Sequence, residues 1–208
     1  KRPEDSHDVR GTFQALISDP WRGQPPSVAD EFLAWIKSVN ALVMAARPDK
    51  RPGEWKAQPN QAGSTLFVLP ELVTGTLREG FERIRALTDR LARALMTMFV
   101  VAEVHPFADG NGRTARIAMN AHLTQGSLSR IIIPTVYRDD YVLPLKALSN
   151  QGDPAAYIAA MTRAQRWSAS FTWDQARPNI RTALEACNAF REDLRNYKLV
   201  FPERTVPT

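Results

Sequence analysis

Residues 105–116, HPFADGNGRTAR, bring a histidine, an aspartate, two glycines around an asparagine and two arginines into one short stretch. They follow ALMTMFVVAEV (94–104), a run that is apolar on nearly all sides and predicts a buried helix. Pro106 predicts the end of this helix, because the residue before a proline is disfavoured in the α region. A second helix is expected from about Asn111 to Gln125, closed by the glycine that follows. The stretch is therefore predicted to be a helix–loop–helix corner.

The rest of the chain has mainly helical patterns. Apolar residues recur at helical spacing in residues 27–43, where Ser27 is expected as the N-cap. Pro70 opens another helical pattern, and Thr88 is expected to cap the helix that leads into the corner. Three further helical patterns follow the corner, at about 140–150, 153–168 and 174–196. Together these patterns predict an all-α fold.

Residues 47–70 interrupt the helices. They contain four prolines and two glycines, and only TLFVL (65–69) has the composition of a strand. We therefore expect a short irregular hairpin, or flap, at about 53–69. A plain surface loop is the alternative.

Length, charge and cysteine content narrow the class of protein. A chain of 208 residues is long enough for one domain with a sizeable core. Its net charge of +5 is scattered, as in residues 78–93, where acidic residues alternate with arginines, so a nucleic-acid site is not expected in this domain. Cys187 is the only cysteine and cannot form an internal disulfide. No apolar run is long enough to suggest a membrane helix, and a cytoplasmic location is expected.

The start of the second helix at the corner predicts an anion site. The first backbone N–H groups of a helix have no intrahelical partner, and the helix dipole is positive there. Gly110 and Gly112 flank Asn111 at this point and would let the backbone approach a phosphate closely. Arg113 and Arg116 lie three residues apart on one side of the helix, and two guanidinium groups suit two phosphoryl groups.

Two further residues of the corner suggest catalysis. Asp109 could hold Mg²⁺, which takes one or two carboxylates and uses substrate phosphates as its other ligands. His105 has a side chain suited to accepting a proton near neutral pH. The combination predicts transfer of a phosphorus-centred group from a nucleoside triphosphate to a hydroxyl. Taken singly, each residue also has an ordinary explanation, as a helix cap, a turn or a helix surface.

The residues resemble a known family. HPFADGNGRTAR is similar, without a departure, to the Fic (filamentation induced by cyclic AMP) motif His-x-Phe-x-Asp/Glu-Gly-Asn-Gly-Arg-x-x-Arg. GEWK (53–56) and LFVLP (66–70) resemble the family's flap region, while RDDY (138–141) and NQGD (150–153) resemble its downstream nucleotide pocket. The resemblance covers roughly residues 27–165 and implies a Fic-type helical bundle with a short β-hairpin flap. It divides the chain into an N-terminal helical or irregular segment (1–26), a Fic core (27–167), and a C-terminal helical extension with a loose tail (168–208).

The resemblance also implies an activity, adenylyl transfer (AMPylation) from ATP to a Ser, Thr or Tyr hydroxyl of a target protein, with Mg²⁺. In this reading His105 is the general base, Asp109 is the Mg²⁺ ligand and Phe107 anchors the loop. The nucleotide would be held by Gly110, Asn111 and Gly112 at the α- and β-phosphates, by Arg113 and Arg116 at the outer phosphates, and by Tyr141 and Asn150 at the adenine. Alternatives are transfer of UMP, phosphocholine or phosphate, removal of AMP, and a nucleotide-binding regulatory or toxin–antitoxin module.

Partners follow from the same resemblance. A target protein is expected to dock on the flap by adding a strand. Independently of the resemblance, the apolar residues in 168–208 are expected to pack against a neighbouring domain or against a second subunit in a homodimer. Many family members resemble one another in an inhibitory helix with Ser/Thr-x-x-x-Glu-Gly/Asn. SVADEF (27–32) has Phe32 in the Gly/Asn place, so we expect the inhibitor upstream of Lys1, on a separate antitoxin-like chain, or not at all. The expected setting is a bacterial cytoplasm, or a host cell into which the protein is delivered.

Overall fold

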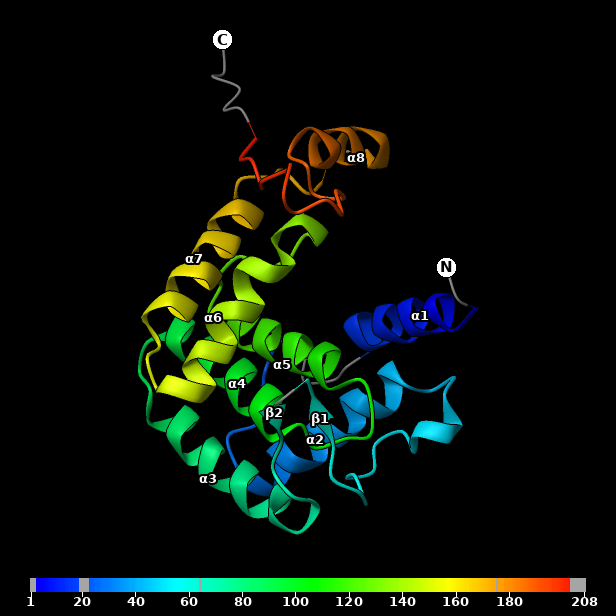
Figure 1. The fold of residues 1–208 in the computed structure, drawn as a ribbon, viewed down its shortest axis with the longest axis vertical. Helices are drawn as coiled ribbons and strands as arrows, with labels where there is room; N and C mark the ends of the chain where they lie inside the picture. The colour runs from blue at the N-terminus through cyan, green and yellow to red at the C-terminus, as the bar shows by residue number, and fades with distance from the viewer. Residues whose placement is uncertain (1–2, 19–22, 64, 175, 203–208) are drawn as a thin grey trace. The chain divides into compact units, whose positions relative to one another are not determined.

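The computed structural model describes residues 3–18, 23–63, 65–174 and 176–202. The chain divides into two compact units, Lys1–Leu128 and Ser129–Thr208, and each is described by itself. Both units are built from helices, with one small antiparallel hairpin in the first (Figure 1). The all-α prediction and its β-hairpin are therefore confirmed. The division falls inside residues 27–167, so the expected domain boundaries stay a prediction.

The described residues of the first unit form five α-helices and the hairpin. The helices are α1 (Pro3–Ser18), α2 (Ala29–Val43), α3 (Val73–Ala86), α4 (Arg90–Val104) and α5 (Asn111–Gln125). Short 3₁₀ turns at Pro48–Lys50 and Pro70–Leu72 flank the segment that contains β1 (Gln61–Ala62) and β2 (Thr65–Leu66). The two strands pair antiparallel, with Gln61 opposite Leu66 and Ala62 opposite Thr65.

The core of the first unit lies around α4 and α5, which pack against each other, while α2 contacts α5 and α3 contacts α4. Phe32 of α2 and Phe81 of α3 meet with their ring centroids 5.2 Å apart. Gly80 lets α3 approach α4, because a Cβ there would come within 2.5 Å of Val100 Cγ1. The second helix of the corner runs from Asn111 to Gln125 with Gly126 as its C-cap, as predicted.

Two predicted helix caps are wrong. Helix α2 begins at Ala29 with Val28 as its N-cap, and its first turn carries Asp30 and Glu31, which favour a helix N-terminus without a side-chain cap from Ser27. Helix α4 is capped by Asp89 and not by Thr88, since an Asp89 carboxylate oxygen accepts the Ala92 N–H at 2.7 Å.

The second unit contains a 3₁₀ turn (Thr135–Tyr137), α6 (Arg138–Gln151), α7 (Ala155–Ala169) and α8 (Arg177–Ala186). Helices α6 and α7 pack together, and the Tyr137 hydroxyl donates to the Ala160 carbonyl of α7 at 3.0 Å. Helix α8 ends well before residue 196. Asn188 takes the left-handed conformation (φ 62°), and the Ala189 N–H donates back to the Leu184 carbonyl, which closes the helix.

Over the described residues, no helix combines the length and apolar character that a membrane span requires.

Candidate active site

The corner between α4 and α5 has an irregular backbone fixed at both ends. His105 is the C-cap of α4 and lies in the left-handed region, with φ 49° and ψ 58°. Gly110 precedes α5 with φ 80°, a conformation that favours glycine. A Cβ on Gly110 would also come within 2.8 Å of Met44 Sδ and 2.9 Å of Asn40 Nδ2. This glycine is therefore required by the packing of the corner against α2 as well as by its backbone angles.

The His105 imidazole is held in one orientation. Its Nδ1 lies 3.1 Å from the Ala102 carbonyl oxygen, so a neutral ring with its proton on Nδ1 leaves Nε2 as a proton acceptor. The Phe67 ring stacks on the imidazole, with centroids 3.8 Å apart and planes inclined by 7°. Burial lowers the pKa of His105, and the positive charge of Lys56 acts in the same direction, while the Ala102 carbonyl and Asp109 act against it. The neutral form, which a general base needs, is therefore favoured.

Asn111 ties the loop together. Its side-chain Oδ1 accepts the Phe107 N–H at 2.9 Å, and its Nδ2 donates to the Phe107 carbonyl at 2.9 Å. Both halves of this buried amide are thus used within the loop. The phosphate contact expected for Asn111 stays a prediction, and its backbone N–H is the group placed to make it.

The N-terminus of α5 offers backbone donors beside an arginine. The Thr114 N–H donates to the Gly110 carbonyl and is the first intrahelical donor, so the N–H groups of residues 111–113 have no acceptor within the helix. A Cβ on Gly112 would lie 3.4 Å from a terminal nitrogen of Arg116, which shows that the Arg116 guanidinium reaches back to the first turn. The structure thus brings Gly112 and Arg116 together at the predicted anion site.

Asp109 stands beside this helix terminus. Its Oδ1 accepts the Gly110 N–H at 2.6 Å and lies 3.6 Å from Nη2 of Arg113. In the part of the chain that the structure describes, no three His, Cys, Asp or Glu side chains gather as a metal cluster. A single carboxylate next to a phosphate site suits Mg²⁺, which completes its shell with phosphate oxygens and water. The donor set therefore fits the expected ion when a triphosphate is present.

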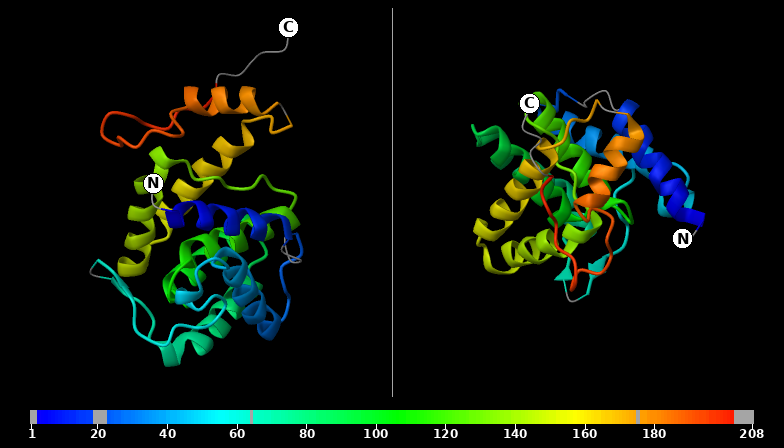
Figure 2. Two further views of the ribbon diagram at one scale, coloured as in Figure 1. Left: turned by 90° about the vertical axis from the view of Figure 1, so that its right-hand side faces the viewer. Right: turned by 90° about the horizontal axis from the view of Figure 1, so that it is seen from above.

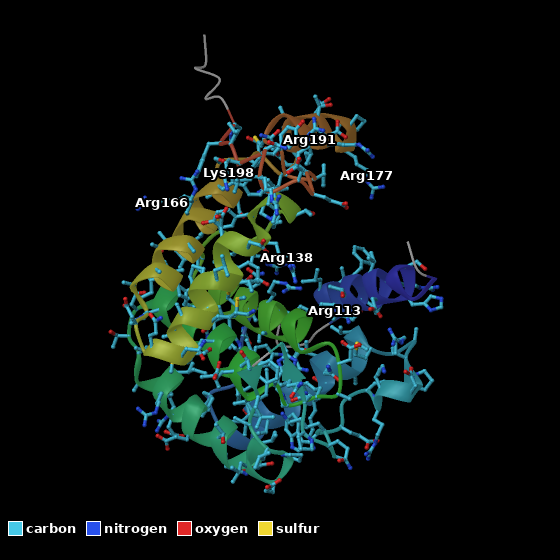
Figure 3. All side chains as sticks on the ribbon, in the orientation of Figure 1. Arg113, Arg138, Arg166, Arg177, Arg191 and Lys198 are labelled. Atoms are coloured by element: carbon cyan, nitrogen blue, oxygen red, sulfur yellow. The ribbon has the colours of Figure 1, made fainter. Side chains whose placement is uncertain are left out.

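Arg113 is already paired with another helix. Its Nη1 lies 2.8 Å from Oδ2 of Asp8 in α1, and the other Asp8 oxygen lies 3.8 Å from Nη1 of Arg47. Asp8 and Arg113 side chains are 22% and 21% exposed, so the pair is mostly shielded from water. Figure 3 shows Arg113 on α5 beside α1, and the views of Figure 2 agree that these two helices are neighbours. An arginine expected to bind phosphate is therefore held by a carboxylate of the protein itself.

Sequence reasoning missed three residues that support the corner. Asn40 of α2 donates to the Asp109 carbonyl at 3.0 Å, and its Oδ1 accepts the Gly53 N–H at 3.0 Å. Lys56 and Asn60, at the base of the flap, bind backbone carbonyls of the corner. The signal for Asn40 was a polar residue on the apolar face of a helix, where a buried amide needs partners. Lys56 carried no comparable signal.

Tyr141 and Asn150 lie in the second unit, both on α6. They are nine residues apart, which places them on opposite sides of an α-helix. The structure therefore does not bring them onto one face of α6, and their contact with adenine stays a prediction.

Comparisons with known proteins agree with the motif. Residues 31–123 match the model of the Fic/DOC family. A 65-residue segment is 38% identical to "Protein adenylyltransferase Fic" of Drosophila mojavensis and, equally, of Drosophila melanogaster. This segment is 31% of this chain but 13% of each relative, so the likeness covers only a small part of those proteins.

Solved structures show the same fold. Fic-1 from C. elegans superposes with a TM-score of 0.66 at 23% identity, over 82% of this chain and 51% of that one. A Fic family protein from Desulfovibrio desulfuricans gives a TM-score of 0.65 at 21% identity, over 88% and 60%. The chain therefore spans about half of the C. elegans structure, and the likeness establishes the Fic-type helical fold.

Proposed function

Since this chain is a Fic/DOC family protein, with the family domain over residues 31–123, we propose that it is a protein adenylyltransferase. It transfers AMP from ATP to a Ser, Thr or Tyr hydroxyl of a target protein. The observation that carries the proposal is the held imidazole of His105, whose Nδ1 faces Ala102 at a corner that also presents a helix N-terminus. The adenylyltransferase name of the Drosophila relatives supports the same activity.

The chain's residues divide the work of the reaction. The N–H groups at the start of α5 bind the phosphates next to the reacting phosphorus, and Arg113 and Arg116 bind the outer ones. Nε2 of His105 takes the proton of the target hydroxyl as its oxygen bonds to the α-phosphorus. The bond from the α-phosphorus to the bridging oxygen breaks, and pyrophosphate leaves. Asp109 would hold Mg²⁺, which would supply charge neutralisation at the phosphates.

The flap is the proposed docking site for the target. Its hairpin is short, Leu66 on β2 is 63% exposed, and Phe67 directly contacts the base. A target segment that pairs with the free edge of this hairpin would bring a hydroxyl toward His105. Because Phe67 directly follows β2 and stacks on His105, it connects the proposed docking hairpin to the proposed general base.

Label transfer tests the proposal. The purified chain is incubated with α-labelled ATP, Mg²⁺ and a cell lysate, and labelled proteins are separated and counted. We expect label on protein that is lost in His105→Ala and kept in Lys198→Ala, an exposed residue of the second unit. Label from γ-labelled ATP, or equal labelling by His105→Ala, contradicts AMP transfer by this site.

Regulation is proposed to come from α1. Ser6–Gly11, SHDVRG, keeps the spacing of the family's inhibitory string, with Arg10 in the place of the glutamate. Gly11 fits closely against the end of α2, because a Cβ there would lie 2.4 Å from the Val43 carbonyl oxygen. On α1 it is Asp8 that reaches a motif arginine, Arg113. We therefore propose that α1 supplies the inhibitory element, in place of the upstream segment or separate chain expected from the sequence, with Asp8 competing with the outer phosphates of ATP.

A further inference from the structure

Two residues at the base of the flap bind four successive carbonyls of the catalytic corner. The Lys56 ammonium donates to the Val104 carbonyl at 3.3 Å, and the Lys56 backbone N–H donates to the Pro106 carbonyl at 2.8 Å. The Asn60 amide donates to the carbonyls of His105 at 3.4 Å and Phe107 at 3.0 Å. We call Lys56 and Asn60 the carbonyl clamp. They are joined to each other by a bond of 2.7 Å between Lys56 Nζ and Asn60 Oδ1.

Lys56 is unusual among the lysines because it is buried. Only 5% of the residue is exposed, and among the described residues no carboxylate lies within ion-pair distance of its ammonium. Burial lowers the pKa of Lys56 to about 8. A buried cation costs stability unless hydrogen bonds compensate it. Its compensation here comes from Asn60 and from Val104, the last residue of α4, where the helix dipole is negative.

The clamped backbone is the part of the corner that needs support. His105 has a left-handed conformation that a non-glycine residue adopts at a cost of roughly 1–2 kcal/mol. Such a conformation persists only where surrounding contacts hold it. The clamp binds the carbonyls on both sides of His105 and the His105 carbonyl itself. It therefore fixes the backbone from which the imidazole extends.

The clamp also sets the charge that faces the imidazole. Two charged groups act on His105, Lys56 from the flap base and Asp109 from the loop, and they oppose each other. The Lys56 charge disfavours an imidazolium and so keeps the base form available. The hydrogen bonds of the clamp and the charge of Lys56 therefore both act on His105.

We propose that Lys56 and Asn60 are positioning residues of the transfer reaction, which hold His105 in its left-handed conformation through their bonds to the carbonyls of residues 104–107. This inference rests on the proposed function for its kinetic consequences. Its structural consequence, the state of the His105 ring, is independent of any target or nucleotide. An anchor that merely attached the flap to the core would leave that ring unchanged.

The test uses variants that separate geometry from charge. Lys56→Met removes both the ammonium bonds and the charge, and Lys56→Arg keeps a charge. Asn60→Leu keeps the lysine side chain and removes the two amide bonds to the corner together with the acceptor of the Lys56 ammonium. Lys50→Met is the control, because Lys50 lies in the same unit and pairs with Asp49 at 3.3 Å, away from the corner. Each full chain is titrated by NMR of the His105 ring and assayed for AMP transfer over a range of pH and ATP concentrations.

Lys56→Met is expected to raise the pKa of His105 and to lower kcat about 10- to 100-fold with a small change in KM for ATP, as for a misplaced catalytic group. Asn60→Leu is expected to lower kcat similarly while shifting the His105 pKa less. Lys56→Arg keeps the His105 pKa low, and Lys50→Met behaves as wild type.

An unchanged His105 ring and pKa in both Lys56→Met and Asn60→Leu overturns the inference, as does a loss seen only in KM for ATP. Should Lys56→Met fail to fold, Asn60→Leu and Lys56→Arg still decide it. Should wild type transfer no AMP, the proposed function fails, and the NMR titration alone decides whether the clamp positions His105.

Discussion

At the residue scale, the corner depends on side chains that hydrogen-bond to its backbone as well as on side chains that are proposed to contact substrate. Both the oxygen and the nitrogen of the Asn111 side-chain amide bind the backbone of Phe107, and Asn40 of α2 donates to the Asp109 carbonyl. Such buried amides are costly when their bonds are lost. These bonds therefore fix the mutual positions of His105, Asp109 and the N-terminus of α5.

Phe67→Ala is expected to raise the pKa of His105, because burial is the main cause of its lowering and the Phe67 ring covers one face of the imidazole. More of the base is then protonated at mildly acidic pH, so AMP transfer falls more steeply as pH decreases. NMR titration of the His105 ring and a pH–rate profile measure both effects. Leu66→Ala, which removes an exposed neighbouring side chain, is the control and leaves the pKa unchanged. A His105 pKa that stays the same in Phe67→Ala contradicts the role of the stack.

At the element scale, the corner illustrates what sequence patterns could and could not predict. The limits of α5 followed from local signals, the glycine before Asn111 and the glycine after Gln125. The N-caps of α2 and α4 each lie one residue beyond the predicted one. At α4 the neighbouring Thr88 and Asp89 compete for the same role, whereas the α2 cap, Val28, has no side-chain oxygen that could signal it. The contacts of Asn40, Lys56 and Asn60 join positions more than forty residues apart, and no local pattern encodes them.

Asp8→Asn is expected to strengthen ATP binding and to raise AMP transfer at low ATP concentration, because it releases Arg113 from a carboxylate of α1. For a partly shielded pair we expect about a three- to tenfold gain in affinity, corresponding to roughly 0.6–1.4 kcal/mol. Calorimetric titration with ATP measures it, and the gain shrinks at high salt. Asp30→Asn, which breaks an exposed pair with Arg78, is the control and gives no gain. Weaker ATP binding in Asp8→Asn argues that Asp8 supports the site instead of competing for it.

At the scale of the whole molecule, each of the two units is built around different helices. The first unit is built around α4 and α5, so the corner that joins these two helices also joins the halves of its core. The second unit closes around α7, where Trp167 is fully buried and donates to the Val200 carbonyl at 2.9 Å. The sequence predicted its helices but extended the last one to 196, because the left-handed Asn188 is not distinguishable from a helical asparagine by pattern alone.

Acid is expected to destabilise the first unit through His122. This residue is 6% exposed, and its Nδ1 has no hydrogen-bond partner among the described residues. Burial lowers the pKa of His122 to about 4, so the unfolded state binds more protons between that value and 6.5. The free energy of unfolding therefore falls as pH falls through this window, by about 2 kcal/mol between pH 7.5 and pH 5.

Urea unfolding at these two pH values measures the effect. His122→Gln is expected to lose most of this pH dependence, and His7→Gln, at an exposed site, is expected to retain it. An equal slope in wild type and His122→Gln means that other groups cause the acid sensitivity.

The pairing of Arg113 with Asp8 has a consequence for discrimination among nucleotides. With Arg113 in its proposed role at the outer phosphates, ATP binding requires it to leave the Asp8 carboxylate, whereas AMP, which carries no outer phosphates, does not. The molecule with α1 in place should therefore prefer short nucleotides more than the same molecule with α1 displaced. The ratio of the ATP affinity to the AMP affinity, measured in solution, then reports how often Arg113 is unpaired from Asp8 of α1.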